Sequence, residues 1–187
     1  RFFIPLLLVG GEKAVFAGAK RLFERPLDVY ENLCIDNGFE FKKSKDSVTV
    51  CGNLKSGEYE INGDISSQFI TGMLLALSTL SGDSRIIINK RLESESYVNM
   101  TVDAMAKFGV RVYREDDYSF FMFGGQEYRA RDMVVEGDWS GAAFLFALDS
   151  ISAGGCVSVN GLNGESLQGD RICKEHLKSL EEGYAEI

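Results

Sequence analysis

The sequence has few of the residues that build metal centres and disulfide frameworks. It contains one histidine, His176, and four cysteines that are far apart and form no Cys-x-x-Cys pair. Metal sites in proteins need several such ligands at close spacing, so we expect no metal ion. The cysteines are expected to be reduced thiols, as in a cytoplasmic protein of this size. They are Cys34, Cys51, Cys156 and Cys173.

The sequence also lacks an initiator methionine and a long apolar run at its start. The opening apolar run, residues 2–9, has about half the length of a membrane-spanning helix and is expected to be a buried helix. A secretory signal peptide is disfavoured, because only Arg1 precedes the run and no small-residue cleavage site follows it. A chain that begins at Arg1 inside an apolar pattern is expected to be a piece of a longer polypeptide.

Basic residues are fewer than acidic ones. The 20 lysines and arginines against 28 acidic residues give a net charge of -8. This charge repels phosphate backbones and anionic lipid surfaces, so nucleic acid and membranes are disfavoured as partners, although a local basic pocket for a small anion remains compatible with it. With 187 residues, 45% of them hydrophobic, and two prolines, the chain is expected to be globular.

An internal repeat organises the chain. Residues 27–41 and residues 98–112 each read as an amphipathic helix, a glycine and a strand, and a third helix begins at Asp170. The glycines that close these helices recur after 71 and then 74 residues and suit left-handed helix caps. They are Gly38, Gly109 and Gly183.

A second repeated element lies between these helices. Residues 63–68 (Gly-Asp-Ile-Ser-Ser-Gln) and 137–142 (Gly-Asp-Trp-Ser-Gly-Ala) are 74 residues apart, and each opens an apolar helix with a polar N-cap. The helices are expected over residues 69–80 and 142–151, followed by strands at 85–88 and 156–159. Hairpin-like pairs of strands are expected at 48–50 with 59–61 and at 118–123 with 133–135. The module therefore reads strand, helix, strand, helix, strand, strand, which predicts an α/β repeat.

Three places in the module carry polar residues where helices begin. Arg25 precedes Pro26, which suits the first position of a helix, and this arrangement favours either a phosphate or carboxylate site or a solvated basic turn. Ser66, Ser67 and Gln68 open the first apolar helix. A plain N-cap by Asp64 or Ser66 is the simpler interpretation of the local sequence.

Comparison with the sister helix favours a ligand. Gly141 and Ala142 stand there in place of Ser67 and Gln68, so the second serine and the amide exceed what capping requires. Ser94 and Tyr97 occupy the same place in the second copy as Arg25 in the first, where open α/β folds bind ligands, although Ser94 alone suits a plain helix start. Trp139, the run at residues 120–123 and the helical His176 are expected to have core or surface roles without chemistry.

These motifs together resemble the EPSP synthase (3-phosphoshikimate 1-carboxyvinyltransferase) family. The resemblance extends from Arg1 to Ile187 and rests on residues 24–29, 63–69, 92–97 with Met100 and Thr101, and 167–170. It implies two halves of three βαβαββ units each, an inverse α/β barrel-like fold, truncated here at both ends. It also implies an enzyme of the cytoplasmic shikimate pathway of aromatic amino-acid biosynthesis. Such an enzyme transfers the enolpyruvyl group of phosphoenolpyruvate to the 5-hydroxyl of shikimate 3-phosphate, releasing phosphate, with no metal or organic cofactor.

The resemblance assigns substrate binding to six residues. For shikimate 3-phosphate they are Ser66, Ser67, Gln68, Ser94 and Tyr97. Arg25 would bind phosphoenolpyruvate, because its guanidinium fork suits two contacts to one oxyanion. No catalytic acid or base is assigned within these residues.

The sequence departs from the family pattern in two ways. Glu95 and Ser96 stand where relatives usually carry a basic residue and proline or glycine, and a carboxylate beside an anion pocket weakens binding unless it points outward. The family's Lys-Ser loop and its Gly-Asn-Ala-Gly-Thr-like turn are absent, and Arg1 matches the arginine that follows this turn. The acidic catalytic residue, Lys-Glu and further arginines would follow Ile187.

We therefore expect residues 1–136 to form most of one half and residues 137–187 the incomplete start of the second half. We expect such a chain to show no catalytic turnover by itself. Three alternatives remain: a UDP-N-acetylglucosamine enolpyruvyl transferase, which shares the repeat but is not expected to carry Ser-Ser-Gln; a non-catalytic homologue that binds shikimate 3-phosphate; and a purely structural repeat protein.

Overall fold

The computed structural model describes residues 1–64, 66–152, 157–181 and 183. The chain divides into two compact units, Arg1–Ala130 and Arg131–Ile187, and each is described by itself. Among the described residues, every helix is too short or too polar to span a bilayer.

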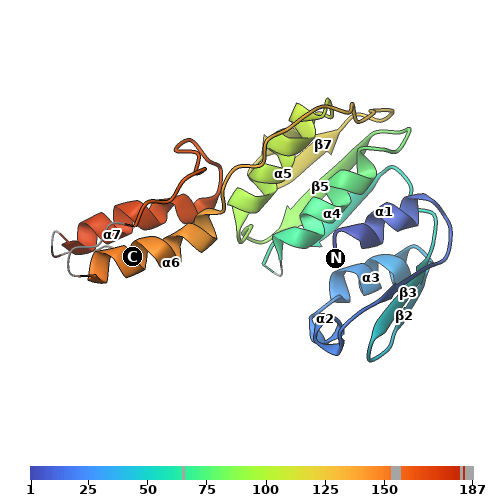
Figure 1. Ribbon diagram of the computed structural model, residues 1–187. Helices are drawn as coiled ribbons and strands as arrows, with labels where there is room; N and C mark the ends of the chain where they lie inside the picture. The colour runs from blue at the N-terminus through green and yellow to red at the C-terminus, as the bar shows by residue number, and fades with distance from the viewer. Residues whose placement is uncertain (65, 153–156, 182, 184–187) are drawn as a thin grey trace. The chain divides into compact units, whose positions relative to one another are not determined.

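The second repeat copy in unit 1 is a complete βαβαββ module. It consists of β4 (Glu58–Asn62), α4 (Ser67–Leu77), β5 (Ser84–Asn89), α5 (Glu95–Lys107), β6 (Tyr113–Asp116) and β7 (Ser119–Met122). The strand order is β4-β5-β7-β6, with β4 and β5 parallel and the other neighbours antiparallel. Helices α4 and α5 lie side by side over one face of this sheet (Figure 1). The predicted α/β repeat is confirmed.

The first copy follows the same plan from its first helix onward. It contains α1 (Phe3–Val9), β1 (Ala14–Ala17), α2 (Lys20–Glu24), α3 (Asp28–Asp36), β2 (Glu40–Lys43) and β3 (Ser47–Cys51). Its antiparallel sheet has the order β1-β3-β2, which matches β5-β7-β6 of the second copy. The predicted opening helix is α1, and only one of its faces is buried. Helix α2 was not predicted, because its short polar sequence has no apolar periodicity.

Unit 2 contains the helices of the third copy. They are α6 (Trp139–Ile151), a 3-10 turn at Gly169–Ile172 and α7 (Cys173–Glu181). Asp138 caps α6 by accepting hydrogen bonds from the backbone N–H groups of Ser140 and Gly141, both at 3.1 Å. The predicted cap is confirmed. Trp139 is buried and His176 is exposed, as expected.

The boundary between the two compact units follows Ala130, whereas the predicted division of the chain follows Glu136. Glu136 belongs with unit 2 because its carboxylate accepts hydrogen bonds from Ser166 Oγ at 2.5 Å and from Gln168 Nε2 at 3.0 Å.

The predicted hairpins are wrong. Residues 48–50 lie in β3 and residues 59–61 in β4, and these strands belong to different sheets. β7, within residues 118–123, pairs with β6, and residues 133–135 form no strand. A turn glycine between two β-like segments indicates that the chain reverses, but it does not determine which strands pair. The strand that pairs with β4 is β5, which follows α4 in the sequence.

The strand predicted at 156–159 begins outside the described residues, and residues 157–159 are not in a strand. One backbone hydrogen bond, from Gly137 N to Gly161 O at 2.8 Å, joins the two segments that would form the parallel pair. In unit 1 the parallel pair β4-β5 is supported by β7 on the other side of β5. The described part of unit 2 has no such antiparallel partner, and an isolated parallel pair is weak.

The three repeated glycines have the predicted conformation. Their φ angles are +68° at Gly38, +90° at Gly109 and +89° at Gly183. The following residues complete the helix caps in unit 1, where Phe39 N donates to Cys34 O at 2.7 Å and Val110 N donates to Met105 O at 2.9 Å. The left-handed caps are confirmed, and a Cβ is disfavoured at all three positions.

Helix α4 lies at the centre of unit 1, and two neighbours approach it closely at Gly72. A Cβ at this position would lie 2.4 Å from Tyr30 Oη on α3 and 3.1 Å from Pro5 Cγ on α1. Tyr30 is fully buried, its ring meets that of Phe69 edge-on at 4.8 Å, and its hydroxyl donates to Phe69 O at 3.4 Å. Burial raises the pKa of Tyr30 far above its ordinary value. Gly72 is therefore required by close packing of three helices.

We predict that Gly72→Ala lowers the free energy of unfolding by about 1–3 kcal/mol, because overpacking at the helix contact outweighs the better helix propensity of alanine. Urea unfolding of the chain measures this change. In a Tyr30→Phe background the cost of Gly72→Ala should be smaller, because the hydroxyl that meets the new methyl group is gone. Equal costs in the two backgrounds would contradict this packing.

Candidate functional site

One cavity of about 580 Å³ in unit 1 brings the six predicted site residues together. The first turn of α4, the first turn of α5 and the segment that follows α2 all contribute to its walls. The predicted residues among its lining are Arg25, Ser66, Ser67, Gln68, Ser94 and Tyr97. The lining contains no carboxylate, so the charge of the described wall is positive.

At the start of α4, one residue caps the helix and its neighbours do not. Ser66 is the N-cap, and its Oγ accepts a hydrogen bond from Gln68 N at 3.3 Å. Asp64, the other predicted candidate, lies two residues before the cap position, and its carboxylate pairs with Lys90 Nζ at 2.5 Å. The side chains of Ser67 and Gln68 take no part in the cap and line the cavity. The exposed N–H groups of a helix start favour an anion at this place.

The loop that carries Ser94 is bound to the loop that carries Ser66. Gly63 N donates to Asn89 O at 2.9 Å, and Glu93 N donates to Gly63 O at 3.1 Å. A Cβ on Gly63 would lie 2.9 Å from the carbonyl oxygen of Arg91, so glycine is needed for this approach. The two loops therefore hold the starts of α4 and α5 at a common edge of the cavity.

Ser94 has an unusual backbone conformation. Its φ of 57° and ψ of 42° are left-handed, and its side chain makes no capping hydrogen bond. Left-handed backbone is uncommon for residues other than glycine and is found at functional sites. Tyr97, one turn later, is 48% exposed, so its ring is available at the cavity wall.

Arg25 lines the cavity, but it does not stand directly before the start of a helix as predicted. Helix α3 begins at Asp28 with Leu27 as its N-cap, so Pro26 precedes the helix and is not its first residue. Proline disfavours helical backbone at the residue before it, and Arg25 is accordingly extended, with φ of -71° and ψ of 145°. Arg25 lines the cavity together with the start of α4, whereas Asp28 at the start of α3 lines a different cavity.

Arg1 was not among the predicted site residues, yet it lies beside them. Its Nη1 donates to Gln68 Oε1 at 3.4 Å, its Nη2 donates to Pro26 O at 2.8 Å, and its guanidinium lies 5.0 Å from the centre of the Phe69 ring. Burial and the charge of Arg25 lower the pKa of Arg1. Two guanidinium groups that line one cavity favour an anionic ligand there, and only the match of Arg1 to a family arginine could have signalled its place.

Arg1 lines a second cavity that adjoins the first. This cavity of about 300 Å³ is lined by Arg1, Arg25 and Gln68, with an otherwise apolar wall. Arg25 and Gln68 line both cavities. The arrangement offers one compartment rich in hydroxyl groups and a neighbouring one with two guanidinium groups.

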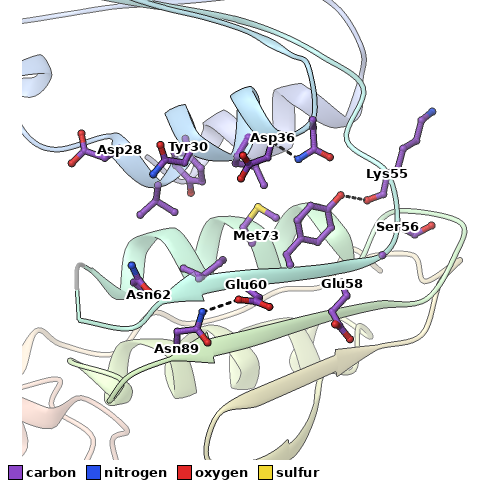
Figure 2. Close-up of a pocket in the computed structure, with 17 residues that line it drawn as sticks. Asp28, Tyr30, Asp36, Lys55, Ser56, Glu58, Glu60, Asn62, Met73 and Asn89 are labelled. Carbon is purple, nitrogen blue, oxygen red and sulfur yellow. Dashed lines mark hydrogen bonds between the residues drawn. The ribbon is translucent and has the colours of Figure 1, made fainter.

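A larger cavity of about 750 Å³, shown in Figure 2, has the opposite charge. It lies between α3 and β4, and Asp28, Asp36, Glu58 and Glu60 outnumber Lys55 in its lining. Four carboxylates disfavour a phosphate or carboxylate ligand. This cavity is larger than the two that Arg25 lines, but the charge of those two cavities suits an anionic ligand better.

At the equivalent place in the third copy, the polar side chains are hydrogen-bonded within unit 2. Ser140, at the position of Ser66, donates its Oγ proton to Asp170 Oδ2 at 2.6 Å. Gln168, at the position of Ser94, accepts from Trp139 N at 2.8 Å and donates to Gly137 O at 2.9 Å. The same scaffold therefore satisfies its polar groups internally in unit 2 and presents them to a cavity in unit 1.

No metal centre is formed by the described residues, among which no three histidine, cysteine or acidic side chains gather as ligands. The expected surroundings of a small anionic ligand are present instead: hydroxyl groups, an amide and guanidinium groups near a helix start.

Comparison with known proteins gives a consistent result. The family EPSP synthase (3-phosphoshikimate 1-carboxyvinyltransferase) matches residues 1–187. The chain is 43% identical over 182 residues to the 3-phosphoshikimate 1-carboxyvinyltransferase of Clostridium kluyveri, and 42% identical over 180 residues to that of Brachyspira hyodysenteriae. Each alignment covers 96% of this chain and 42% of the relative. The chain thus spans less than half the length of these relatives.

A solved structure of EPSP synthase from Acinetobacter baumannii has a similar fold. The TM-score is 0.59 with 21% sequence identity, and the match covers 81% of this chain and 35% of the other. At this identity the likeness supports the fold alone.

We predict that the two serines at the start of α4 respond differently to substitution. Ser66→Ala should lower the free energy of unfolding by about 1 kcal/mol, because the N-cap hydrogen bond is lost. Ser67→Ala should change it by less, because Ser67 does not cap the helix. Thermal or urea unfolding of both variants measures the difference, and a larger loss for Ser67→Ala would contradict the assignment of the cap.

Proposed function

The chain belongs to the EPSP synthase family, and on this premise we propose that it forms part of an enzyme that joins phosphoenolpyruvate to shikimate 3-phosphate. In this reaction the 5-hydroxyl oxygen of shikimate 3-phosphate bonds to C2 of phosphoenolpyruvate and loses its proton, while C3 gains a proton. The C2–O bond to phosphate then breaks as a proton leaves C3, which restores the double bond and releases phosphate. The single observation that carries the proposal is the convergence of six polar and basic residues on one cavity without a carboxylate.

Shikimate 3-phosphate is assigned to the compartment with the hydroxyl groups. Ser66, Ser67 and Gln68 would hold the phosphate and hydroxyl groups, since the N–H groups of a helix start favour a phosphate, and Ser94 and Tyr97 would complete the pocket. The buried position of Ser67, 7% exposed, supports a ligand contact from which water is largely excluded.

Phosphoenolpyruvate is assigned to the compartment with the arginines. Arg25 and Arg1 each offer a guanidinium fork for its carboxylate or phosphate, and a bound anion relieves their mutual repulsion. Gln68 lines both compartments, so the two substrates would lie next to each other. Such a site lowers the barrier by holding the reacting atoms together and by stabilising negative charge that moves during the reaction.

We propose that residues 1–136 form most of one half of the enzyme and residues 137–187 the start of the other, a division close to the boundary of the compact units after Ala130. The 42% coverage of the relatives supports only the incompleteness of the two halves. The acid and base of the reaction are not assigned to these residues, so this chain alone is expected to be inactive. The full-length enzyme below means the polypeptide that carries these residues together with the segments that complete both halves.

The enzyme is expected to act in the cytoplasm. The described cysteines Cys34, Cys51 and Cys173 are free thiols, which suits a reducing compartment. Burial raises the pKa of Cys34 to about 11, so this thiol stays protonated and unreactive at neutral pH.

We predict that the full-length enzyme binds shikimate 3-phosphate and that a Ser67→Ala, Gln68→Ala double variant loses at least about tenfold in affinity, the equivalent of one good charged hydrogen bond. Isothermal titration measures the change. Thr79→Ala is the matched control, because Thr79 lies just beyond the other end of α4 and outside the cavity.

The titration, together with a turnover assay of the same protein, has three informative results. Turnover with a UDP-sugar in place of shikimate 3-phosphate would favour the sister transferase. Binding without turnover by the full-length protein would favour a non-catalytic homologue. Unchanged affinity in the double variant would refute the assignment of these residues.

We predict that Arg25→Ala in the full-length enzyme raises KM for phosphoenolpyruvate by roughly 10- to 100-fold, as expected when a charged contact to a substrate is lost. The KM for shikimate 3-phosphate should change much less. Steady-state kinetics with each substrate varied in turn measures both values. Arg21→Ala, on the exposed surface of α2, is the control, and equal losses for the two substrates would count against the role of Arg25.

A further inference from the structure

Glu95 turns away from the cavity although it adjoins two of its residues. Its carboxylate is not part of the lining and pairs with the guanidinium of Arg114 on β6. The Asn99 side chain also hydrogen-bonds this carboxylate, and these contacts lower the pKa of Glu95. The negative charge that the sequence places beside an anion pocket is therefore directed outward and paired.

Arg114 is held in position by the hairpin that joins β6 and β7. Its Nε donates to Asp116 O at 3.1 Å, its Nη2 donates to Asp117 O at 3.4 Å, and its guanidinium lies 5.8 Å from the centre of the Phe120 ring. Asp116 tightens the same turn by accepting from Tyr118 N at 2.7 Å and from Ser119 Oγ at 2.8 Å. An isolated surface ion pair contributes little, but a guanidinium already fixed by several partners loses little further freedom when it binds a carboxylate.

Glu95 is the first residue of α5 and directly follows Ser94, whose left-handed backbone lacks a capping hydrogen bond. The first turn is closed by the bond from Tyr97 N to Ser94 O at 3.1 Å. A conformation that is unfavourable by itself persists only when its surroundings hold it. The contact between Glu95 and Arg114 is a side-chain tether at this point of the chain.

We propose that Arg114 is a positioning residue which, through Glu95, holds Ser94 and Tyr97 in the orientation that binds shikimate 3-phosphate. The ligand in this statement rests on the proposed function. Arg114 itself does not line the cavity and contacts no substrate in this proposal. The β6–β7 hairpin thereby supports the binding site from outside it.

The test uses the full-length enzyme with Arg114→Met, Arg114→Lys and Glu95→Gln. Arg85→Met is the matched control, because Arg85, like Arg114, pairs with a glutamate and lies 5.8 Å from a phenylalanine ring centre. Its partner is Glu115 on β6, whose Oε2 lies 2.8 Å from Arg85 Nε. The control pair joins β5 to β6 and does not reach α5. The readouts are KM for each substrate, kcat, and amide hydrogen exchange at Tyr97 and Val98.

Arg114→Met and Glu95→Gln are each expected to raise KM for shikimate 3-phosphate about three- to tenfold, with the double variant no worse than either single one, as for residues that act as a unit. The KM for phosphoenolpyruvate should stay within about twofold, and Arg114→Lys should recover part of the loss, because a lysine keeps the charge but not the fork. Exchange at Tyr97 and Val98 should accelerate in the same variants, whatever ligand the site binds. Arg85→Met should change none of these values.

The sign of the Glu95→Gln effect is decisive. If Glu95 acts only as an unfavourable charge near the anion, its neutralisation tightens binding of shikimate 3-phosphate. That result would overturn the positioning role and leave the proposed function intact. Unchanged hydrogen exchange in Arg114→Met also overturns it. If the unsubstituted full-length enzyme does not bind shikimate 3-phosphate, the proposed function fails, while faster exchange in the variants would still support the tether.

Discussion

The close contact of three helices at Gly72 determines where the candidate site lies. Because α1 and α3 pack directly against the middle of α4, the middle of this helix is fixed, and its first turn is held at the wall of the candidate site. Apolar residues from Phe69 onward anchor the helix, while Ser66, Ser67 and Gln68 occupy its polar end. The division between core and site therefore runs across a single helix.

The repeat shows how one scaffold can serve two purposes. In the second copy the starts of α4 and α5 present hydroxyl and amide groups to a cavity. In the third copy Ser140 and Gln168 occupy the corresponding places and are hydrogen-bonded within unit 2. Both helices begin with a side-chain N-cap, but the cap is Ser66 in the second copy and Asp138, the counterpart of Asp64, in the third. The copies therefore share the use of a cap and differ in which residue supplies it and in the side chains around it.

The sequence predicted those features that depend on neighbouring residues. The apolar periodicity of α4, the left-handed glycines and the polar helix starts are local, and the repeat showed that the motifs occupy equivalent places. Features that depend on distant partners were missed or wrong. The pairing of β4 with β5, the approach of Arg1 to Gln68 and the pairing of Glu95 with Arg114 all join residues that only the folded chain brings together. The sequence also left open whether Asp64 or Ser66 caps α4, because that depends on the residue at which the helix begins.

The two backbone hydrogen bonds of Gly63 join loops that lie more than twenty residues apart in the sequence. Because these bonds use main-chain atoms, they persist when the side chains around them change. The loops can therefore diversify in chemistry while keeping their spacing, but neither can be lengthened or shifted independently of the other. Over evolutionary time, substitutions should be tolerated at this edge of the cavity far more often than insertions, so that the site changes its selectivity without losing its shape.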